Sequence, residues 1–507
     1  MLETVNTSLR SVVKDIILGD YLTPLLDSSP LRHHSNTKGN SIAFTNCNLF
    51  DGINPELQQD VNVLVDGDKI SEVCPRERIN IPDKYQVIDA DGYTMMPGLI
   101  DNHVHLCSPL TFQVNMAAVR QMPKQIALNN MRTINSGVTT VCDMGGPQAF
   151  IKEFTNLADN NRIPGPRYLN CFTLISPRKG KKLGYPTQVK ILNPFDAWLL
   201  EGQVATRPNT LAELKNICYK VKEDGGTHLK TSFQTQPFSR KKYENQSDFP
   251  VLDDEWMKAI LLIGKETGLI VDIHSPYGAD AEKCVDLAIE VGARIRIQHM
   301  TFDRDLKSTF IQKMQDHGFY VIPTVMVYGD AFHMPDFINW LDKEPKEYMM
   351  PEANRQSKAS ILHGIDLEPY SGKRVMEHDV TFFRDNFDFV RRNTQQAHNA
   401  GIIGFGTDLG GTNTGFFGRI CSEIKHYVEF GIPFFDILKY LTSVNAGING
   451  LDDRGVIKPG KLADLIFVDG NPLTDPVAVL NNVSTVMKGG IFLKYKGTEL
   501  TTSQFAI

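Results

Sequence analysis

Five residues that could bind metal ions lie in short, separate motifs along the chain. His103 and His105 alternate within one motif, and His274, His299 and Asp408 each end or follow a short apolar run. Alternation along a strand places the first two imidazoles on one face, so they can bind one cation from the same side. A lone histidine is more often structural than a ligand, but imidazoles and a carboxylate together form the donor set of a hydrolytic metal site.

Lys230 adds a second kind of chemistry. It ends the segment Gly225–Lys230, close to the end of another apolar run. Burial disfavours an ammonium group, so the pKa of a buried lysine falls and its neutral amine can react with carbon dioxide. The resulting carbamate is negatively charged and has two oxygens that can bridge two cations. The alternative is a lysine at the mouth of the fold that pairs with a carboxylate, and His228 is a further candidate in the same neighbourhood.

Eight short apolar runs, separated by longer helix-like stretches, carry these residues. This alternation predicts β/α units, and eight such units predict a closed (β/α)8 TIM barrel in the α/β class. Functional residues of such barrels lie at the carboxyl ends of the strands, which would bring the candidate ligands together. The predicted strands are 94–106, 139–144, 167–172, 227–233, 269–275, 293–300, 319–326 and 402–407.

Shorter strand-like segments bracket this barrel at both ends of the chain. They divide the sequence into an N-terminal extension at 1–41, a first β segment at 42–96, the barrel at 97–452 and a second β segment at 453–507. The extension has apolar residues at helical spacing. We expect it to pack on its own domain or on a second subunit, which favours a homo-oligomer.

The composition excludes several classes of protein. The 507 residues have a formal net charge of −6, so there is no general attraction for nucleic acid. The eight cysteines form no CxxC pair, and there is no signal peptide or long apolar run. We therefore expect a cytoplasmic protein that acts on a small-molecule substrate and binds neither nucleic acid nor membrane.

Taken together, the motifs resemble the metal-dependent amidohydrolase superfamily. The resemblance rests on Met96–His105, Gly137–Thr140, His274, His299, Gly406–Asp408 and Lys458–Leu465, in this order. It implies a (β/α)8 barrel with a small β-sandwich domain built from both terminal segments. Ile163–Arg167 is similar to a segment of the imidazolonepropionase-related and Xaa-Pro dipeptidase-like branch, which includes ochratoxin amidase.

The resemblance also implies a binuclear centre with two Zn²⁺ ions per subunit, although Mn²⁺, Co²⁺ or Fe²⁺ suits the same donors. The implied ligands are His103, His105 and Asp408 for the first ion, His274 and His299 for the second, and carbamylated Lys230 as the bridge. Asp408 is implied to act as general base and then general acid. The implied reaction is hydrolysis of an amide, peptide-like, N-acyl amino acid or lactam C–N bond by a metal-activated hydroxide.

Three departures from the family pattern put the substrate in question and leave the metal ligands unchanged. Gln298 stands where relatives usually have glutamate before the histidine, the spacing from His274 to His299 is a few residues longer than usual, and the loop after the third predicted strand is basic and contains Arg178. Separately, residues 327–396 form a long insertion with Tyr328 and His333. We expect Arg178, Tyr328 and His333 to contact substrate, although a basic loop is often simply solvated. Lactone, ester or phosphoester hydrolysis on the same centre is the alternative reaction. A catalytically inactive scaffold related to dihydropyrimidinase is the alternative to an enzyme.

Overall fold

The computed structural model describes residues 41–78, 80–108, 113–114, 116–179, 182–183, 190–191, 205–236, 251–332, 376–410 and 417–498. Residues 1–40 of the expected extension, His333 and most of the predicted 327–396 insertion lie outside this description.

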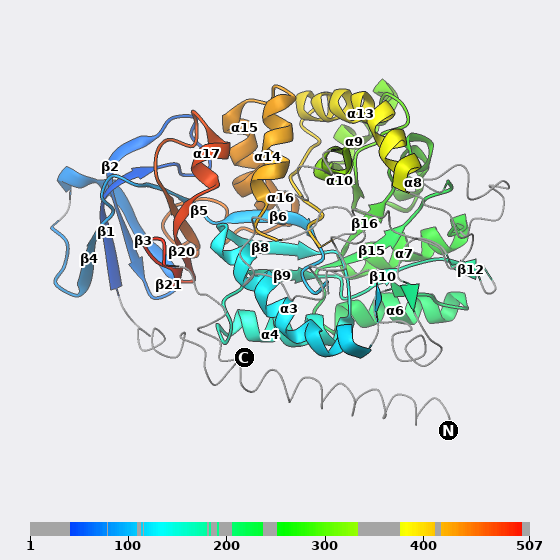
Figure 1. Ribbon diagram of the computed structural model, residues 1–507, viewed down its shortest axis with the longest axis horizontal. Coiled ribbons are helices and arrows are strands. Elements are labelled where there is room, and N and C mark those ends of the chain that lie inside the picture. Colours follow the sequence, from blue (N-terminus) through cyan, green and yellow to red (C-terminus); the bar gives the residue numbers. More distant parts are fainter. Residues whose placement is uncertain are drawn as a thin grey trace.

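Strands from both ends of the chain share one eight-stranded sheet, drawn in blue and red in Figure 1. Its order is β21 (Ile491–Lys494), β20 (Val483–Lys488), β19 (Leu465–Val468), β5 (Thr94–Pro97), β1 (Ser41–Leu49), β2 (Gln58–Asp66) and β3 (Lys69–Pro75), and β4 (Tyr85–Asp89) pairs with β1. The key junction is β5, because it pairs antiparallel with β19 and parallel with β1. A separate apolar cluster that includes Phe44, Met95, Leu465 and Met487 is buried against this sheet.

The middle of the chain forms two parallel sheets. One contains β6 (Leu99–Val104), β8 (Val138–Asp143) and β9 (Arg167–Asn170). The other has the order β14 (Ala205–Thr206), β10 (Leu174–Ile175), β15 (His228–Ser232), β16 (Ile270–His274), β17 (Ile295–Gln298) and β18 (Tyr320–Ile322). Two small sheets pair β11 (Arg178–Lys179) with β12 (Lys182–Leu183) and β13 (Lys190–Ile191) with β7 (Gln113–Val114).

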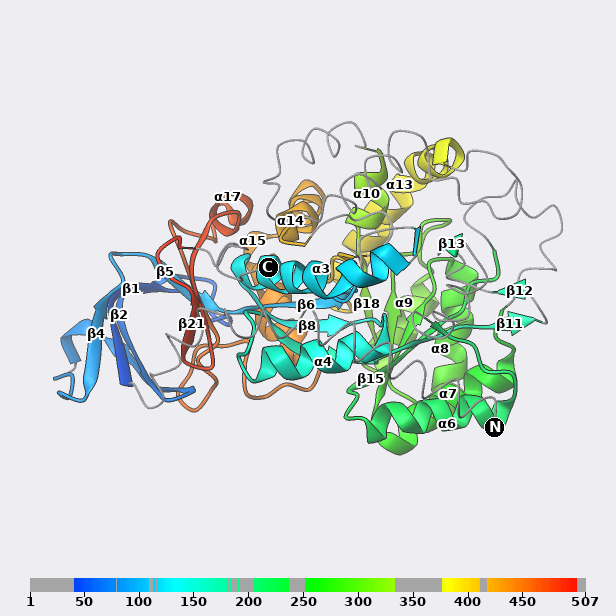
Figure 2. The same ribbon diagram turned by 60° about the horizontal axis from the view of Figure 1, so that its bottom comes forward.

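Helices alternate with the parallel strands and cover them, as Figures 1 and 2 show. They are α3 (Met116–Asn135), α4 (Gln148–Asp159), α6 (Leu211–Glu223), α7 (Asp254–Thr267), α8 (Gly278–Val291), α9 (Ser308–Asp316), α10 (Met326–Phe332), α13 (Met376–Asn399) and α14 (Ile420–Glu429). Shorter helical segments follow at α15 (Phe434–Lys439), Tyr440–Val444, α16 (Asn445–Ile448) and α17 (Pro476–Leu480). Every residue of β6, β8, β15, β16 and β17 is buried, which is typical of parallel strands covered by helices.

Hydrogen bonds connect the two parallel sheets at two places. At one place, the amide of Thr227, just before β15, donates to the Asn170 carbonyl of β9 at 2.9 Å. At the other, residues 402–409 lie between β18 and β6, where they form isolated bridges at Val321 with Ile403 and at Val104 with Leu409. The predicted eighth strand is therefore present as single bridges and not as a continuous strand. The α/β alternation is confirmed, whereas closure into one complete barrel stays a prediction.

An ion pair joins β9 to the terminal sheet. Arg167 donates from Nε and Nη2 to the two carboxylate oxygens of Asp464 at 3.0 and 3.1 Å, and the Gly489 amide donates to the same carboxylate at 2.7 Å. The Asp464 side chain is only 2% exposed. This contact fixes the two parts of the chain against each other.

We expect Arg167→Met to lower the free energy of unfolding by about 3 kcal/mol, because it leaves a buried carboxylate without its cation. Urea unfolding followed by circular dichroism measures the change. The matched control is Arg392→Met, which breaks a pair with Asp305 whose side chains are 40% and 51% exposed. The control substitution should lower the free energy of unfolding by less than about 1 kcal/mol. Equal losses of unfolding free energy in the two variants would contradict the stabilising role of the Arg167–Asp464 ion pair.

Two further observations bear on the expectations from composition. Of the helices that the structure describes, none combines the length and the apolar character needed to cross a bilayer. All eight cysteines carry free thiols, and seven of them are buried.

Candidate metal centre

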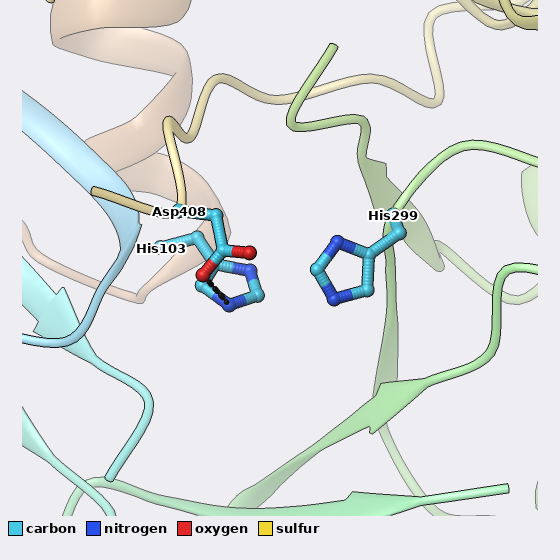
Figure 3. A group of neighbouring side chains, drawn as sticks. All are labelled: His103, His299 and Asp408. Atoms are coloured by element: carbon cyan, nitrogen blue, oxygen red, sulfur yellow. Dashed lines mark ion pairs between the residues drawn. The ribbon is translucent and has the colours of Figure 1, made fainter. Parts of the chain in front are cut away.

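Four histidine rings converge at the carboxyl ends of the parallel strands. His103 lies in β6 and His105 just beyond it, His274 ends β16, and His299 directly follows β17. The ring centroids are 5.6 Å apart for His103 and His105, 5.0 Å for His103 and His299, and 4.5 Å for His274 and His299. Asp408 reaches the same point from the segment between β18 and β6, and Figure 3 shows it beside His103 with His299 facing both. The structure thus brings together all five ligand candidates.

The distances around Asp408 fit a metal ion. Its Oδ1 lies 3.3 Å from Nε2 of His103 and 3.3 Å from Nε2 of His105. Zn²⁺ binds such atoms at about 2.0–2.1 Å, and a tetrahedron of that size has edges of about 3.3 Å. Ligand atoms of His103, His299 and Asp408 also lie within 4.8 Å of one another. The donor set and its spacing therefore suit a divalent cation.

Two of these residues have an unusual backbone conformation. The φ angles of His299 and Asp408 are 73° and 59°, in the left-handed region that residues other than glycine rarely adopt. Each such residue costs of order 1–3 kcal/mol and persists where the surrounding structure holds it. For Asp408, the holding contact is a hydrogen bond of 2.7 Å from its amide to the His103 carbonyl. Strain of this kind is common at functional sites, and here it turns both side chains toward the same point.

Hydrogen bonds select the ring nitrogen that each histidine can offer to a cation. Nδ1 of His103 lies 2.6 Å from Gln298 Oε1, Nδ1 of His105 lies 2.7 Å from the Gly145 carbonyl, and Nδ1 of His299 lies 2.7 Å from Thr324 Oγ1. A carbonyl oxygen only accepts, so Nδ1 of His103 and His105 carries the proton and Nε2 keeps its lone pair. Such partners orient metal-binding histidines in known sites.

His274 has the opposite arrangement. Its Nε2 lies 2.8 Å from Gln234 Oε1, while the Gln234 amide nitrogen donates to the Gln236 carbonyl at 2.6 Å. Because the Gln234 oxygen only accepts, Nε2 of His274 carries the proton and Nδ1 carries the lone pair. The roles of Gln234, Gln298 and Thr324 were not predicted from the sequence. The signal that could have found Gln298 was its place in the motif, where the resemblance leads one to expect glutamate.

The protonation states of three of the four histidines also favour metal binding. Burial lowers the pKa of His103 and His274 well below the ordinary value and that of His299 to about 3, so these rings are neutral donors. Burial also opposes charge on His105, but its contact with Asp408 outweighs this and raises its pKa. Burial by itself would raise the pKa of Asp408, yet the hydrogen bond and charge of His105 lower it overall, so the carboxylate is ionised.

Lys230 lies in β15, on the same sheet as His274 and His299. Its side chain is buried, and among the residues that the structure describes Nζ has no hydrogen-bond partner. Burial lowers its pKa to about 8, which makes the neutral amine accessible near physiological pH. Carbamylation requires a neutral amine, and burial favours that form. The residue therefore fits the bridging role that the resemblance implies.

A second group of possible ligands, Cys142, His228 and Asp272, is held by an arginine. Arg296 donates from Nε to Asp272 Oδ1 at 2.7 Å and from Nη2 to Oδ2 at 2.5 Å, and Nη2 also lies 3.3 Å from Cys142 Sγ. The positive charge of a guanidinium that engages both carboxylate oxygens disfavours a metal cation at this group. The His228 ring lies 3.0 Å from Thr227 Oγ1, 3.7 Å from Cys142 Sγ and 3.9 Å from Asp272 Oδ2, so its described contacts are with Thr227 and this group.

The substrate-contact candidates are less well placed. Tyr328 lies in α10, its side chain is buried, and its hydroxyl donates to the Met300 carbonyl at 2.9 Å. Its ring also lies 5.7 Å from that of Phe302. These contacts belong to the core, so a role in substrate binding stays a prediction. Arg178 lies in β11 without a described side chain, and His333 is outside the described residues.

The sequence pattern of the amidohydrolase family matches residues 94–492. A dihydroorotase from Mycobacterium tuberculosis is 40% identical over 62 residues, which are 12% of this chain and only 14% of that protein. Among solved structures, a Xaa-Pro dipeptidase with bound methionine has a TM-score of 0.64 at 22% identity, covering 90% of this chain and 100% of the other. The A. niger ochratoxinase has a TM-score of 0.64 at 18% identity, covering 90% and 96%. At these identities the structural likeness establishes the fold alone, whereas the match over residues 94–492 confirms the resemblance to the amidohydrolase family.

Proposed function

The chain belongs to the amidohydrolase family, and from this premise we propose that it is a binuclear metal-dependent hydrolase that cleaves a C–N bond in a small molecule. The observation that carries the proposal is the convergence of four imidazoles and the Asp408 carboxylate beside the buried Lys230. The substrate classes that we propose are amides, peptide-like bonds, N-acyl amino acids and lactams.

We assign six ligands to two Zn²⁺ ions, with Mn²⁺, Co²⁺ or Fe²⁺ as substitutes. They are His103, His105 and Asp408 for the first ion, His274 and His299 for the second, and carbamylated Lys230 between them. When bound, the ions would supply a nucleophilic water at neutral pH and polarise the scissile carbonyl. The described hydrogen bonds support this assignment, because an amide or carbonyl oxygen accepts the proton of one ring nitrogen in His103, His105 and His274, so the other nitrogen of each ring carries the lone pair.

Asp408 is the residue that we assign to proton transfer. Its lowered pKa keeps the carboxylate ionised, so it can accept a proton from water during attack on the carbonyl. It can then donate that proton to the leaving nitrogen as the C–N bond breaks. The bond from its amide to the His103 carbonyl holds its backbone, which positions the carboxylate throughout this cycle.

We also propose that residues 97–452 form a closed (β/α)8 barrel, flanked by a β-sandwich from 42–96 and 453–507. The hydrogen bonds that connect the two parallel sheets support closure, and the shared eight-stranded sheet supports a domain built from both ends. We further propose a homo-oligomer in a reducing compartment such as the cytoplasm. The eight free cysteines support the compartment, and light scattering of purified protein tests the oligomer.

Purified protein reconstituted with zinc is expected to bind two ions per subunit, measured by elemental analysis. The physical reason is the number of donors, since six ligands exceed the four that one tetrahedral ion needs. Less than about half an equivalent would contradict the enzyme proposal and favour an inactive scaffold.

The substrate class is tested with zinc-loaded and manganese-loaded protein against N-acyl amino acids, Xaa-Pro dipeptides, aromatic amides and lactams. Structures named for a Xaa-Pro dipeptidase and an ochratoxinase share the fold, which makes these compounds the first choice. Turnover of lactones or phosphoesters, with none of the amides hydrolysed, would contradict the C–N assignment. Within that screen, Arg178, Tyr328 and His333 are the residues that we propose for substrate contact.

A further inference from the structure

Gln298 links a metal-ligand candidate to the buried ion pair beneath it. Its side-chain Oε1 lies 2.6 Å from Nδ1 of His103, and its Nε2 donates to Asp272 Oδ1 at 2.5 Å. Gln298 and Asp272 are both completely buried. The amide therefore spans two polar groups that have no access to water.

The donors and acceptors in this contact have one consistent arrangement. An ionised carboxylate only accepts hydrogen bonds, so the Gln298 amide must direct its nitrogen to Asp272 and its oxygen to His103. An amide oxygen also only accepts, so Nδ1 of His103 must carry the proton. Nε2 of His103 is then the nitrogen with a lone pair, and it is the nitrogen that lies 3.3 Å from Asp408 Oδ1.

Arg296 keeps Asp272 ionised and fixed in this arrangement. Its guanidinium contacts both carboxylate oxygens, and its Nη1 donates to Asn449 Oδ1 at 2.5 Å. Strand register places the backbone of Arg296 beside that of Asp272, and the backbone of Gln298 beside that of His274. Alternation along β17 then directs the Arg296 and Gln298 side chains to the same face. The network is thus built into two adjacent strands and not into a loop.

We propose that Gln298 is a positioning residue for the first metal ion, fixing the tautomer and ring orientation of His103 through a contact that Asp272 and Arg296 hold in place. This inference rests on the proposed metal centre. A glutamine can set the tautomer only because its own orientation is set by the carboxylate behind it. Removal of a residue that hydrogen-bonds a metal ligand typically lowers metal affinity by about 10-fold to 100-fold.

The test compares Gln298→Leu, which keeps the volume and removes both contacts, with Gln298→Glu, whose protonated form keeps an oxygen facing His103 and a donor facing Asp272. The control is Gln395→Leu, since Gln395 donates to the Phe430 carbonyl from α13, outside this network. Zinc dissociation constants are measured by competition with a chelating dye. The visible spectrum of the Co²⁺-loaded protein reports the coordination, and the melting temperature of the metal-free protein reports the fold.

We expect Gln298→Leu to weaken one of the two zinc ions by about 10-fold to 100-fold and to change the Co²⁺ spectrum. Gln298→Glu and Gln395→Leu should retain both ions within about 3-fold of the wild-type affinity, which is small beside that effect. The metal-free melting temperature of Gln298→Leu should stay close to that of Gln395→Leu.

Two results would overturn the inference. One is wild-type affinity for both ions in Gln298→Leu. The other is a lowered melting temperature of metal-free Gln298→Leu with equal weakening of both ions, which would indicate only a packing role. Failure of the underlying proposal looks different, because the wild-type protein itself would then bind no zinc.

Discussion

Asp408→Asn is expected to lower kcat by about 10³-fold while the protein still binds metal. The asparagine retains an oxygen that can lie near Nε2 of His103 and His105, but an amide cannot accept and return a proton at neutral pH. The measurements are kcat on a substrate found in the screen and metal content by elemental analysis.

The matched control for this variant is Asp305→Asn, which changes an exposed carboxylate paired with Arg392. It should leave kcat and metal content unchanged. Near wild-type turnover by Asp408→Asn would refute the proton-transfer role. Loss of both ions together with activity would instead make Asp408 mainly a ligand.

Lys230→Ala is expected to lose the bridged metal pair, with metal content falling from two ions per subunit to one or fewer and activity falling by at least about 10²-fold. Without the carbamate, no anionic group remains to bind both cations at once. Added acetate or propionate should restore part of the activity, because a carboxylate offers the same two oxygens. Wild-type metal content in this variant would contradict the bridging role.

Lys488 provides the matched control, since it is also buried and its pKa is also lowered, to about 7. Its Nζ, however, donates to the carbonyls of Ala158 and Gly165, both at 2.7 Å. We expect carbamylation at Lys230 and none at Lys488. Nuclear magnetic resonance of protein equilibrated with ¹³C-bicarbonate should therefore give one carbamate signal, absent in Lys230→Ala and retained in Lys488→Met.

The carbamylation of Lys230 should also depend on pH in a defined direction. Burial lowers its pKa to about 8, so the reactive neutral amine predominates above that value and is lost as the pH falls through it. At pH 6 only about one amine in a hundred is neutral. Reconstitution of metal-free protein with zinc and bicarbonate should accordingly be faster at pH 8 than at pH 6. Equal rates would indicate that the amine does not limit assembly.

Much of the candidate centre could be predicted because its candidate ligands lie at the ends of buried strands. His103, His274 and His299 each follow an apolar run, and runs that alternate with helices become parallel strands whose carboxyl ends meet at one edge. The same reasoning predicted a continuous strand at 402–407, where the structure has an isolated bridge at Ile403. That stretch has the apolar residues of a strand, yet its left-handed turn at Asp408 and single bridges leave it outside regular strand geometry.

The ligand types, their order and the α/β alternation were thus determined by the sequence itself, because they depend on residue identity and on spacing along one strand. Which ring nitrogen an outer hydrogen bond engages, and which buried lysine has no hydrogen-bond partner among the described residues, was decided only by the tertiary structure. Gln298 meets His103, and Arg296 occupies Asp272, through contacts between strands. Lys230 and Lys488 are both buried lysines. They differ in that the Lys488 amine donates hydrogen bonds to two carbonyls, whereas the Lys230 amine has no hydrogen-bond partner among the described residues.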